Sequence, residues 1–149
     1  MRSVESRTGA DGVDPRVGDG IQIRVSSDAD IVTARQRGRR LALELGFSSG
    51  NATLIATAIS ELARNMLLYA GSGEIRLDRL ERDERLGLEV VARDQGPGIP
   101  DVRQALLDGY STARRLGLGL PGVKRLMDEF QIETGPGAGT TVVVRKWSR

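Results

Sequence analysis

The fold is decided by one apolar stretch in the middle of the chain, residues 54–69, which has the sequence LIATAISELARNMLLY. Its apolar side chains recur three and four residues apart, a spacing typical of one buried face of an α-helix. Ser48 and Ser49 precede the stretch as candidate N-cap residues, and Gly71 and Gly73 follow it as helix breakers. The pattern predicts a long helix that ends at about Tyr69 and faces the core.

The segments on both sides of this helix carry strand and helix patterns of their own. Residues 21–25 (IQIRV) alternate apolar and polar side chains, which predicts a half-buried strand. Residues 26–28 (SSD) then supply an N-cap for a helix that runs to about Leu45. After the central helix, residues 74–80 and 86–92 flank a charged turn and are predicted to form a hairpin.

The C-terminal third predicts one more helix and a closing hairpin. Residues 120–130 (LPGVKRLMDEF) have apolar side chains at helical spacing, and residues 131–134 and 140–147 flank the glycine-rich turn 135–139. Strands and helices are segregated along the chain and do not alternate strictly. We therefore expect an α+β fold, a two-layer sandwich whose mixed, mostly antiparallel sheet is covered on one face by helices.

Length and composition indicate a single domain. The chain has 149 residues, of which 39% are apolar, which is enough for one compact core. Residues 1–18 mix Gly, Asp, Ser, Arg and Pro without periodicity, so we expect a mobile N-terminal tail there and the domain over residues 19–149. The pattern also breaks up from about residue 94 to 117, except for a short helical piece near 102–107. A segment of this length predicts a functional lid.

The composition excludes several classes of enzyme and partner. The chain has no Cys and no His, which excludes Ser-His-Asp hydrolases, Cys-His enzymes, zincins and a phosphohistidine on this chain. A net charge of +2 and an aromatic content of 3% predict no nucleic-acid partner. There is no apolar run of roughly 18 residues and no hydrophobic signal core, so we expect a cytoplasmic protein with no membrane contact.

Glu61 and Asn65 are the first candidate site. They lie four residues apart on the predicted central helix, which places them one turn apart on nearly the same face. A carboxylate and an amide oxygen presented together can bind a hydrated Mg²⁺ ion and orient an attacking hydroxyl. The alternative is structural: Glu61 pairs with Arg64 at i,i+3 and Asn65 is solvated. Taken alone, the spacing favours the structural alternative.

Asp94 is the second candidate, because it directly follows a predicted strand and opens the turn DQGPGIP. A carboxylate at a strand end can reach into a cleft and accept a hydrogen bond from an amino group such as the exocyclic amine of adenine. Gly96 and Gly98 let the backbone approach a ligand closely and adopt positive φ. The alternative is a strand-ending Asp in an ordinary Gly-Pro turn.

Gly117 and Gly119 precede the last predicted helix, with Pro121 near its first turn. Glycines at a helix start expose backbone N–H groups that suit a phosphate, and the alternative is a flexible hinge. The spacing is neither a Walker A loop nor a Rossmann fingerprint. Thr140 and Thr141 begin the final strand, where a hydroxyl either helps to hold a base or simply belongs to a β-branched strand residue.

The first predicted helix is crowded with arginines, at Arg35, Arg37, Arg39 and Arg40. Such a charge run forms either a solvated face or a docking patch for a partner. The solvated face is the more common outcome.

Taken together and in order, these motifs resemble the four motif regions of the GHKL (Bergerat-fold) ATP-binding superfamily, which includes histidine kinases, gyrase-type ATPases and bacterial anti-sigma kinases. The resemblance covers about residues 21–145. It implies ATP and Mg²⁺ as cofactors. It also implies that Glu61, in the N box, is the catalytic base and that Asn65 is the Mg²⁺ ligand.

The resemblance implies nucleotide-binding roles for the other motif residues. The first glycine box binds adenine, the second lies beside the phosphates, and a threonine supports adenine binding. The matching residues are Asp94, Gly96 and Gly98 in the first box, Gly117 and Gly119 in the second, and Thr140.

Within the superfamily, residues 57–65 (TAISELARN), 69–71 (YAG) and 117–130 (GLGLPGVKRLMDEF) are similar to the RsbT type of serine/threonine switch kinase. This similarity implies phosphoryl transfer from ATP to Ser or Thr of STAS-domain antagonists in a stressosome, and activation of a PP2C-type phosphatase after release. The sequence departs from that type in the lid. Ala113, Arg114 and Arg115 stand where smaller, Gly-rich residues are usual.

Two other functions are consistent with the same superfamily. One is an anti-sigma factor of the SpoIIAB or RsbW type, whose main output is to sequester a sigma factor. Those proteins usually carry His at the position of Tyr69 and lack Arg64. The other is a pseudo-kinase binding module that holds ATP only as a structural ligand.

Overall fold

The computed structural model describes residues 2–5, 14–98, 106 and 119–148. These residues form one six-stranded sheet with the strand order β1-β5-β6-β4-β3-β2, together with helices α1, α2 and α4. In chain order the elements are β1 (Arg2–Glu5), β2 (Arg16–Val25), α1 (Asp28–Glu44), α2 (Ser49–Ala70), β3 (Gly73–Arg82), β4 (Arg85–Asp94), α4 (Gly119–Leu126), β5 (Glu129–Thr134) and β6 (Thr140–Trp147).

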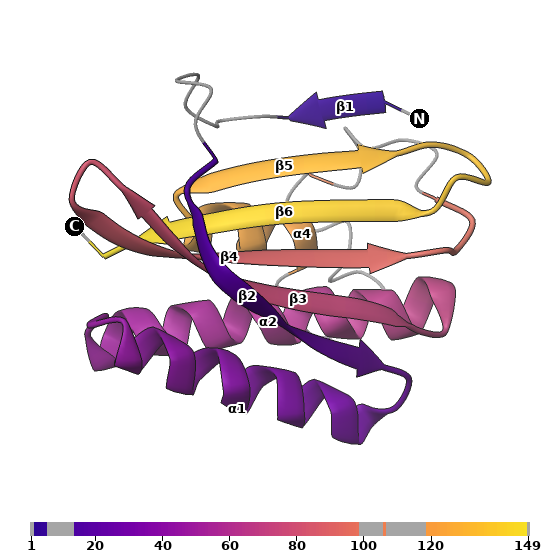
Figure 1. Ribbon diagram of the computed structural model, residues 1–149. Coiled ribbons are helices and arrows are strands. Elements are labelled where there is room, and N and C mark those ends of the chain that lie inside the picture. Colours follow the sequence, from indigo (N-terminus) through magenta and orange to yellow (C-terminus); the bar gives the residue numbers. More distant parts are fainter. Residues whose placement is uncertain (1, 6–13, 99–105, 107–118, 149) are drawn as a thin grey trace.

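The helices and the sheet form two layers. The helices α1, α2 and α4 lie on one face of the sheet (Figure 1), and α2 packs against α1, α4, β3 and β4. The predicted α+β two-layer class is therefore confirmed. We expected a mixed, mostly antiparallel sheet. All strand pairs among the described residues are antiparallel, and none of them is parallel. Of the described helices, none has the length and apolar character needed to cross a bilayer.

The central helix α2 begins and ends with the expected signals. The side chain of Ser48 accepts the backbone N–H of Asn51 at 3.1 Å, as an N-cap residue does. Gly71 adopts a φ of +86° and donates its N–H to the carbonyls of Met66 and Leu67, which is the left-handed cap that glycine tolerates best. Between these caps the apolar stripe of α2 is buried in the core against the sheet.

The segment that follows α4 differs from the prediction. We expected a helix over residues 120–130, but α4 ends at Leu126 and β5 begins at Glu129. Phe130 fits the helical spacing of the residues before it and also alternates with Ile132, and both side chains are buried. Residues 129–134 form a strand and do not continue the helix, because pairing of β5 with β6 satisfies the backbone hydrogen-bonding groups of both segments.

The N-terminal segment contains more strand than we expected. In place of a tail without regular structure over residues 1–18, Arg2–Glu5 form β1, which pairs antiparallel with β5, and β2 begins at Arg16. The sequence pattern does not predict β1 or the start of β2, because these segments pair through backbone groups, which a search for apolar periodicity does not detect. Residues 6–13 lie outside the described part of the chain.

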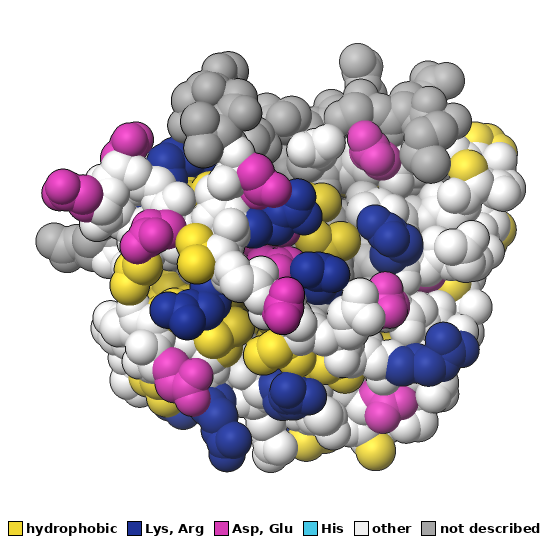
Figure 2. Space-filling view, viewed as in Figure 1, with side chains coloured by type: hydrophobic (Ala, Val, Ile, Leu, Met, Phe, Trp, Pro, Cys, Tyr) yellow, Lys and Arg dark blue, Asp and Glu magenta, His cyan; other side chains and the backbone are white. Residues whose placement is uncertain are grey.

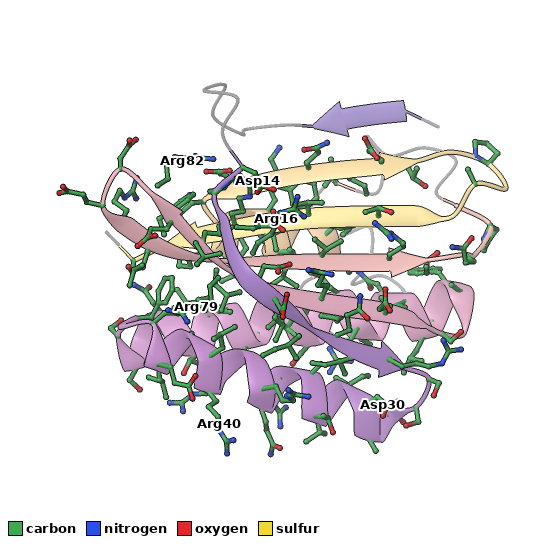
Figure 3. The ribbon with its side chains drawn as sticks, viewed as in Figure 1. Asp14, Arg16, Asp30, Arg40, Arg79 and Arg82 are labelled. Carbon is green, nitrogen blue, oxygen red and sulfur yellow. The ribbon has the colours of Figure 1, made fainter. Side chains whose placement is uncertain are left out.

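Hydrogen bonds and an ion pair stabilise the start of β2 at the sheet. Glu81 donates its backbone N–H to the carbonyl of Pro15 at 2.7 Å. Arg16 donates from Nη2 to Asp14 Oδ2 at 2.9 Å, and Figure 3 shows the two residues close together where the chain enters β2. The side-chain and backbone hydrogen bonds from Arg16 lower the pKa of the Asp14 carboxyl from 3.8 to about 2. The domain boundary predicted at residue 19 therefore falls inside β2.

Candidate active site

Glu61 joins two helices at the centre of the candidate site. It lies on the buried face of α2 and is only 6% exposed. Its Oε1 atom accepts the backbone N–H of Gly119, the first residue of α4, at 3.3 Å. A carboxylate is placed well at a helix start, because the N–H groups of the first turn carry partial positive charge. Asn65 follows one turn later on α2 and is half-buried.

Arg64 forms an ion pair with Oε2 of the same carboxylate through Nη1. The structural alternative for Glu61 is therefore present in the structure. The two side chains differ in exposure, because that of Arg64 is 40% exposed and that of Glu61 is 7% exposed. Contacts on both carboxylate oxygens hold Glu61 in one orientation at the edge of the core, which suits a base that must meet a proton at a fixed place.

A second group of polar residues lies at the ends of three neighbouring strands. Asp94 ends β4 and is opposite Thr140, which begins β6, and Thr140 is in turn opposite Thr134 at the end of β5. Side chains two residues apart on a strand share a face, and Ala92 and Val142 lie in the core beneath the helices. Asp94, Thr140 and Thr134 therefore form one row on the helix-covered face.

The row is connected by hydrogen bonds. Asp94 Oδ1 accepts the backbone N–H of Gly96 at 2.9 Å. Thr134 Oγ1 lies 3.0 Å from the carbonyl oxygen of Gly139 and 2.9 Å from Thr140 Oγ1. No described residue forms a hydrogen bond with Asp94 Oδ2, so the carboxylate can accept a donor from a ligand.

Gly96 and Gly98 allow the loop after β4 to approach other parts of the protein. A Cβ atom on Gly96 would lie 2.6 Å from the Cβ atom of Ala70 at the end of α2. Gly98 has a φ of +84°, and a Cβ atom there would collide with the carbonyl of Gly135. We expected these glycines for close approach to a ligand. In the structure they are required because the loop packs against α2 and the β5–β6 turn.

Some predicted positions lie outside the described part of the chain. These are Gly117 and the lid residues Ala113, Arg114 and Arg115. Gly119 is described: it begins α4 with a φ of +66° and is buried, so the predicted helix start next to the glycines is confirmed.

The donor set suits Mg²⁺ bound mainly through a nucleotide. Among the described residues there is no group of three or more Asp, Glu, His or Cys side chains that would hold a metal by themselves. Mg²⁺ in phosphoryl-transfer sites is usually held by one or two protein oxygens together with substrate phosphates and water. The amide oxygen of Asn65, half-buried one turn from Glu61, fits that role.

Comparison with known proteins identifies the family. Residues 50–148 match the family described as histidine kinase-, DNA gyrase B-, and HSP90-like ATPase. The chain belongs to this ATPase family. The match begins at the start of α2 and ends after β6, so it includes both groups of candidate residues.

Individual relatives refine the assignment. The chain is 52% identical over 127 residues to serine/threonine-protein kinase RsbT of Bacillus subtilis (strain 168), which covers 85% of this chain and 96% of that protein. It is 32% identical over 99 residues to an anti-sigma F factor of Caldanaerobacter subterraneus subsp. tengcongensis, which covers 62% of this chain and 68% of that protein. The predicted resemblance to the RsbT type is confirmed, and so is the prediction of an enzyme of the protein serine/threonine kinase class.

Sequence reasoning missed one residue of this site. The sequence pattern predicts Thr134 only as the end of a strand, although this residue is 1% exposed and its side chain contacts Thr140. A signal was available, because a hairpin closed by the turn 135–139 places its last and first strand residues opposite each other.

Proposed function

We propose that this chain transfers the γ-phosphoryl group of ATP to a serine or threonine hydroxyl of a STAS-domain antagonist protein. The observation that carries the proposal is the buried, doubly anchored carboxylate of Glu61 beside Asn65, in a chain that matches nearly the whole length of a serine/threonine-protein kinase. The motif resemblance implies the same two roles, a base at Glu61 and a Mg²⁺ ligand at Asn65.

In this proposal, the residues at one end of the site act on the phosphates and the acceptor hydroxyl, and those at the other end bind the adenine. Glu61 accepts the proton of the acceptor hydroxyl, and Asn65 holds Mg²⁺, which neutralises charge on the phosphates when bound. Asp94 and Thr140 bind the adenine at the ends of β4 and β6. The backbone around Gly117 and Gly119 lies beside the phosphates in this proposal. Positioning and electrostatics supply most of the acceleration in such reactions.

Release from the antagonist then frees the kinase for a second partner. We propose that the released chain binds and activates a PP2C-type phosphatase in the cytoplasm, as the resemblance to switch kinases implies. The anti-sigma F relatives support the same general setting, because they indicate a partner-switching protein.

The direct test follows labelled phosphate from ATP to a purified STAS-domain antagonist. The wild-type chain should label Ser or Thr on the antagonist as an acid-stable phosphoester. Glu61→Gln keeps the shape of the side chain but removes the base, so transfer should fall by roughly 10² to 10⁴ while nucleotide still binds. Asn65→Ala should raise the Mg²⁺ concentration needed for transfer.

The matched control is Glu84→Gln, which makes the same change at an exposed position in the β3–β4 turn and should transfer at the wild-type rate. Wild-type transfer by Glu61→Gln would show that this carboxylate is only structural. Nucleotide binding without any transfer would indicate a pseudo-kinase module.

An anti-sigma factor is the second candidate, because 19 proteins match the chain significantly and anti-sigma F factors are among them. The two candidates differ in the partner that binds tightly. Capture of a sigma factor with no transfer to any STAS-domain protein would replace the kinase proposal with the anti-sigma function.

A further inference from the structure

We propose that Thr134 determines nucleotide specificity by fixing the direction of the Thr140 hydroxyl, so that Thr140 and Asp94 both present hydrogen-bond acceptors to the base. This inference rests on the proposed function, because it assumes that Asp94 and Thr140 meet the base of ATP. It adds to that function a residue outside the motif set and a reason for choosing adenine.

The direction of the hydrogen bonds follows from what each group can donate. A carbonyl oxygen only accepts, so in the 3.0 Å contact between Thr134 Oγ1 and the Gly139 carbonyl the proton belongs to Thr134. A threonine hydroxyl has one proton, and that of Thr134 is thereby used. In the 2.9 Å contact between the two threonine hydroxyls, Thr140 must therefore be the donor.

The Gly139 carbonyl that sets this order is held in place. Gly139 has a φ of +76°, a conformation that favours glycine, and a Cβ atom there would collide with the carbonyl of Asp94. Thr134 itself is 1% exposed, so bulk water does not compete for its proton. The chain of hydrogen bonds from Thr140 through Thr134 to Gly139 thus has one stable direction.

The consequence concerns the ligand. With its proton given to Thr134, the Thr140 hydroxyl offers only lone pairs to a base, and the Asp94 carboxylate likewise only accepts. An exocyclic amine, as in adenine, supplies donors to both groups. A carbonyl at the same place, as in hypoxanthine, presents an acceptor to two acceptors and leaves polar groups unpaired, which sites of this kind reject strongly.

The test compares dissociation constants for ADP and IDP by calorimetry, because neither nucleotide carries a γ-phosphate to transfer. Thr134→Val keeps the shape but removes the hydroxyl, so Thr140 regains a proton to donate. We expect the preference for ADP over IDP to fall about tenfold in this variant. Thr134→Ser restores the hydroxyl and should keep the wild-type preference.

Thr141→Val is the matched control. It makes the same substitution one residue after Thr140, on the opposite face of β6, and should change neither dissociation constant. Thr134→Ala is measured as well as Thr134→Val, so that the ADP-to-IDP preference can still be compared with the wild type if one of the two variants folds poorly.

An unchanged ADP-to-IDP ratio in Thr134→Val or Thr134→Ala, including a parallel loss of both affinities, would overturn the inference. If the wild-type chain binds ADP but does not distinguish it from IDP, the inference fails and the proposed kinase function stands. If the wild-type chain binds neither nucleotide, the proposed function itself fails.

Discussion

Glu61 and Asp94 are two carboxylates with different surroundings, which fit the different roles proposed for them. Glu61 is buried and both of its oxygens are engaged, by Arg64 and by the start of α4. Asp94 is half-buried and uses one oxygen for the backbone N–H of Gly96. The first carboxylate is therefore fixed in orientation, whereas the second keeps an acceptor for a ligand. Single substitutions at this scale should separate catalysis from binding.

Replacing Asp94 with Asn exchanges an acceptor-only group for an amide that also donates. The amide can present its NH₂ group to the amine of adenine, which leaves both donors unsatisfied. ATP affinity should therefore fall by about 1–3 kcal/mol, which is roughly 5- to 150-fold. Titration calorimetry measures the change, and Asp83→Asn in the exposed β3–β4 turn is the control. An unchanged affinity in Asp94→Asn would contradict the assignment of adenine to this end of the site.

Replacing Arg64 with Ala should reduce turnover more than stability. The Arg64 side chain is 40% exposed, so solvent weakens the ion pair and its loss should cost at most about 1 kcal/mol of unfolding free energy. Glu61 loses its ion pair with Arg64, and turnover should fall by about 10- to 100-fold because the proposed base is held less accurately. Chemical denaturation and single-turnover transfer measure the two effects, and Arg64→Lys should recover part of the rate. A turnover equal to wild type in Arg64→Ala would show that the ion pair has no part in positioning.

In helix α2 and in strands β4, β5 and β6, the regular spacing of side chains both builds the core and positions the candidate site residues. One face of α2 carries apolar side chains into the core, and Glu61 lies on that buried face with Asn65 at its margin. Strands β4, β5 and β6 bring Asp94, Thr134 and Thr140 together because their ends are in register. In the proposed function, the helix thus supplies the catalytic end of the site and the sheet supplies the base-binding end.

Deleting residues 2–5 should destabilise the domain, although the sequence pattern alone predicts no effect. The deletion removes the pairing of β1 with β5 and leaves β5 as the edge strand of the sheet. The melting temperature should fall by about 2–4 °C for each kcal/mol of lost pairing. Ser3→Ala keeps the backbone ladder and should melt like the wild type. If the deletion variant also melts like the wild type, β1 contributes nothing to stability.

The whole molecule has a mixed surface with one unusual concentration of charge. Figure 2 shows basic and acidic side chains interspersed over the face in view, as expected from a net charge of +2. On α1, by contrast, Arg37 and Arg40 have no ion pair among the described residues and line a hollow of about 340 Å³ together with Ile21, Gln36, Leu41 and Glu44. Arg40 extends away from α1 toward solvent (Figure 3). This surface favours an acidic face on a protein partner.

Reversing the charge at Arg37 and Arg40 to Glu should slow transfer to the STAS-domain protein and leave ATP affinity unchanged. The wild-type rate should fall as salt is added, because solvent-exposed charge attraction is screened, and the variant should lose most of that dependence. Initial rates of transfer at several salt concentrations measure both effects. Arg24→Glu, an exposed reversal on β2, is the control. Equal rates and equal salt dependence would place docking elsewhere on the molecule.

Elements whose pattern is local could be predicted from the amino-acid sequence. The caps and the apolar period of α2, the alternation in β3 and β4, and the spacing of Glu61 and Asn65 are all set within a few residues, so the fold class and the superfamily could be predicted. Features that depend on distant partners are visible only in the folded chain. The strand β1, the contact of Gly119 with Glu61 and the alignment of Asp94 with Thr140 arise from backbone pairing and packing between segments far apart in the chain. Backbone N–H and C=O groups are the same in every residue except proline, so the sequence carries no direct record of which of them will pair.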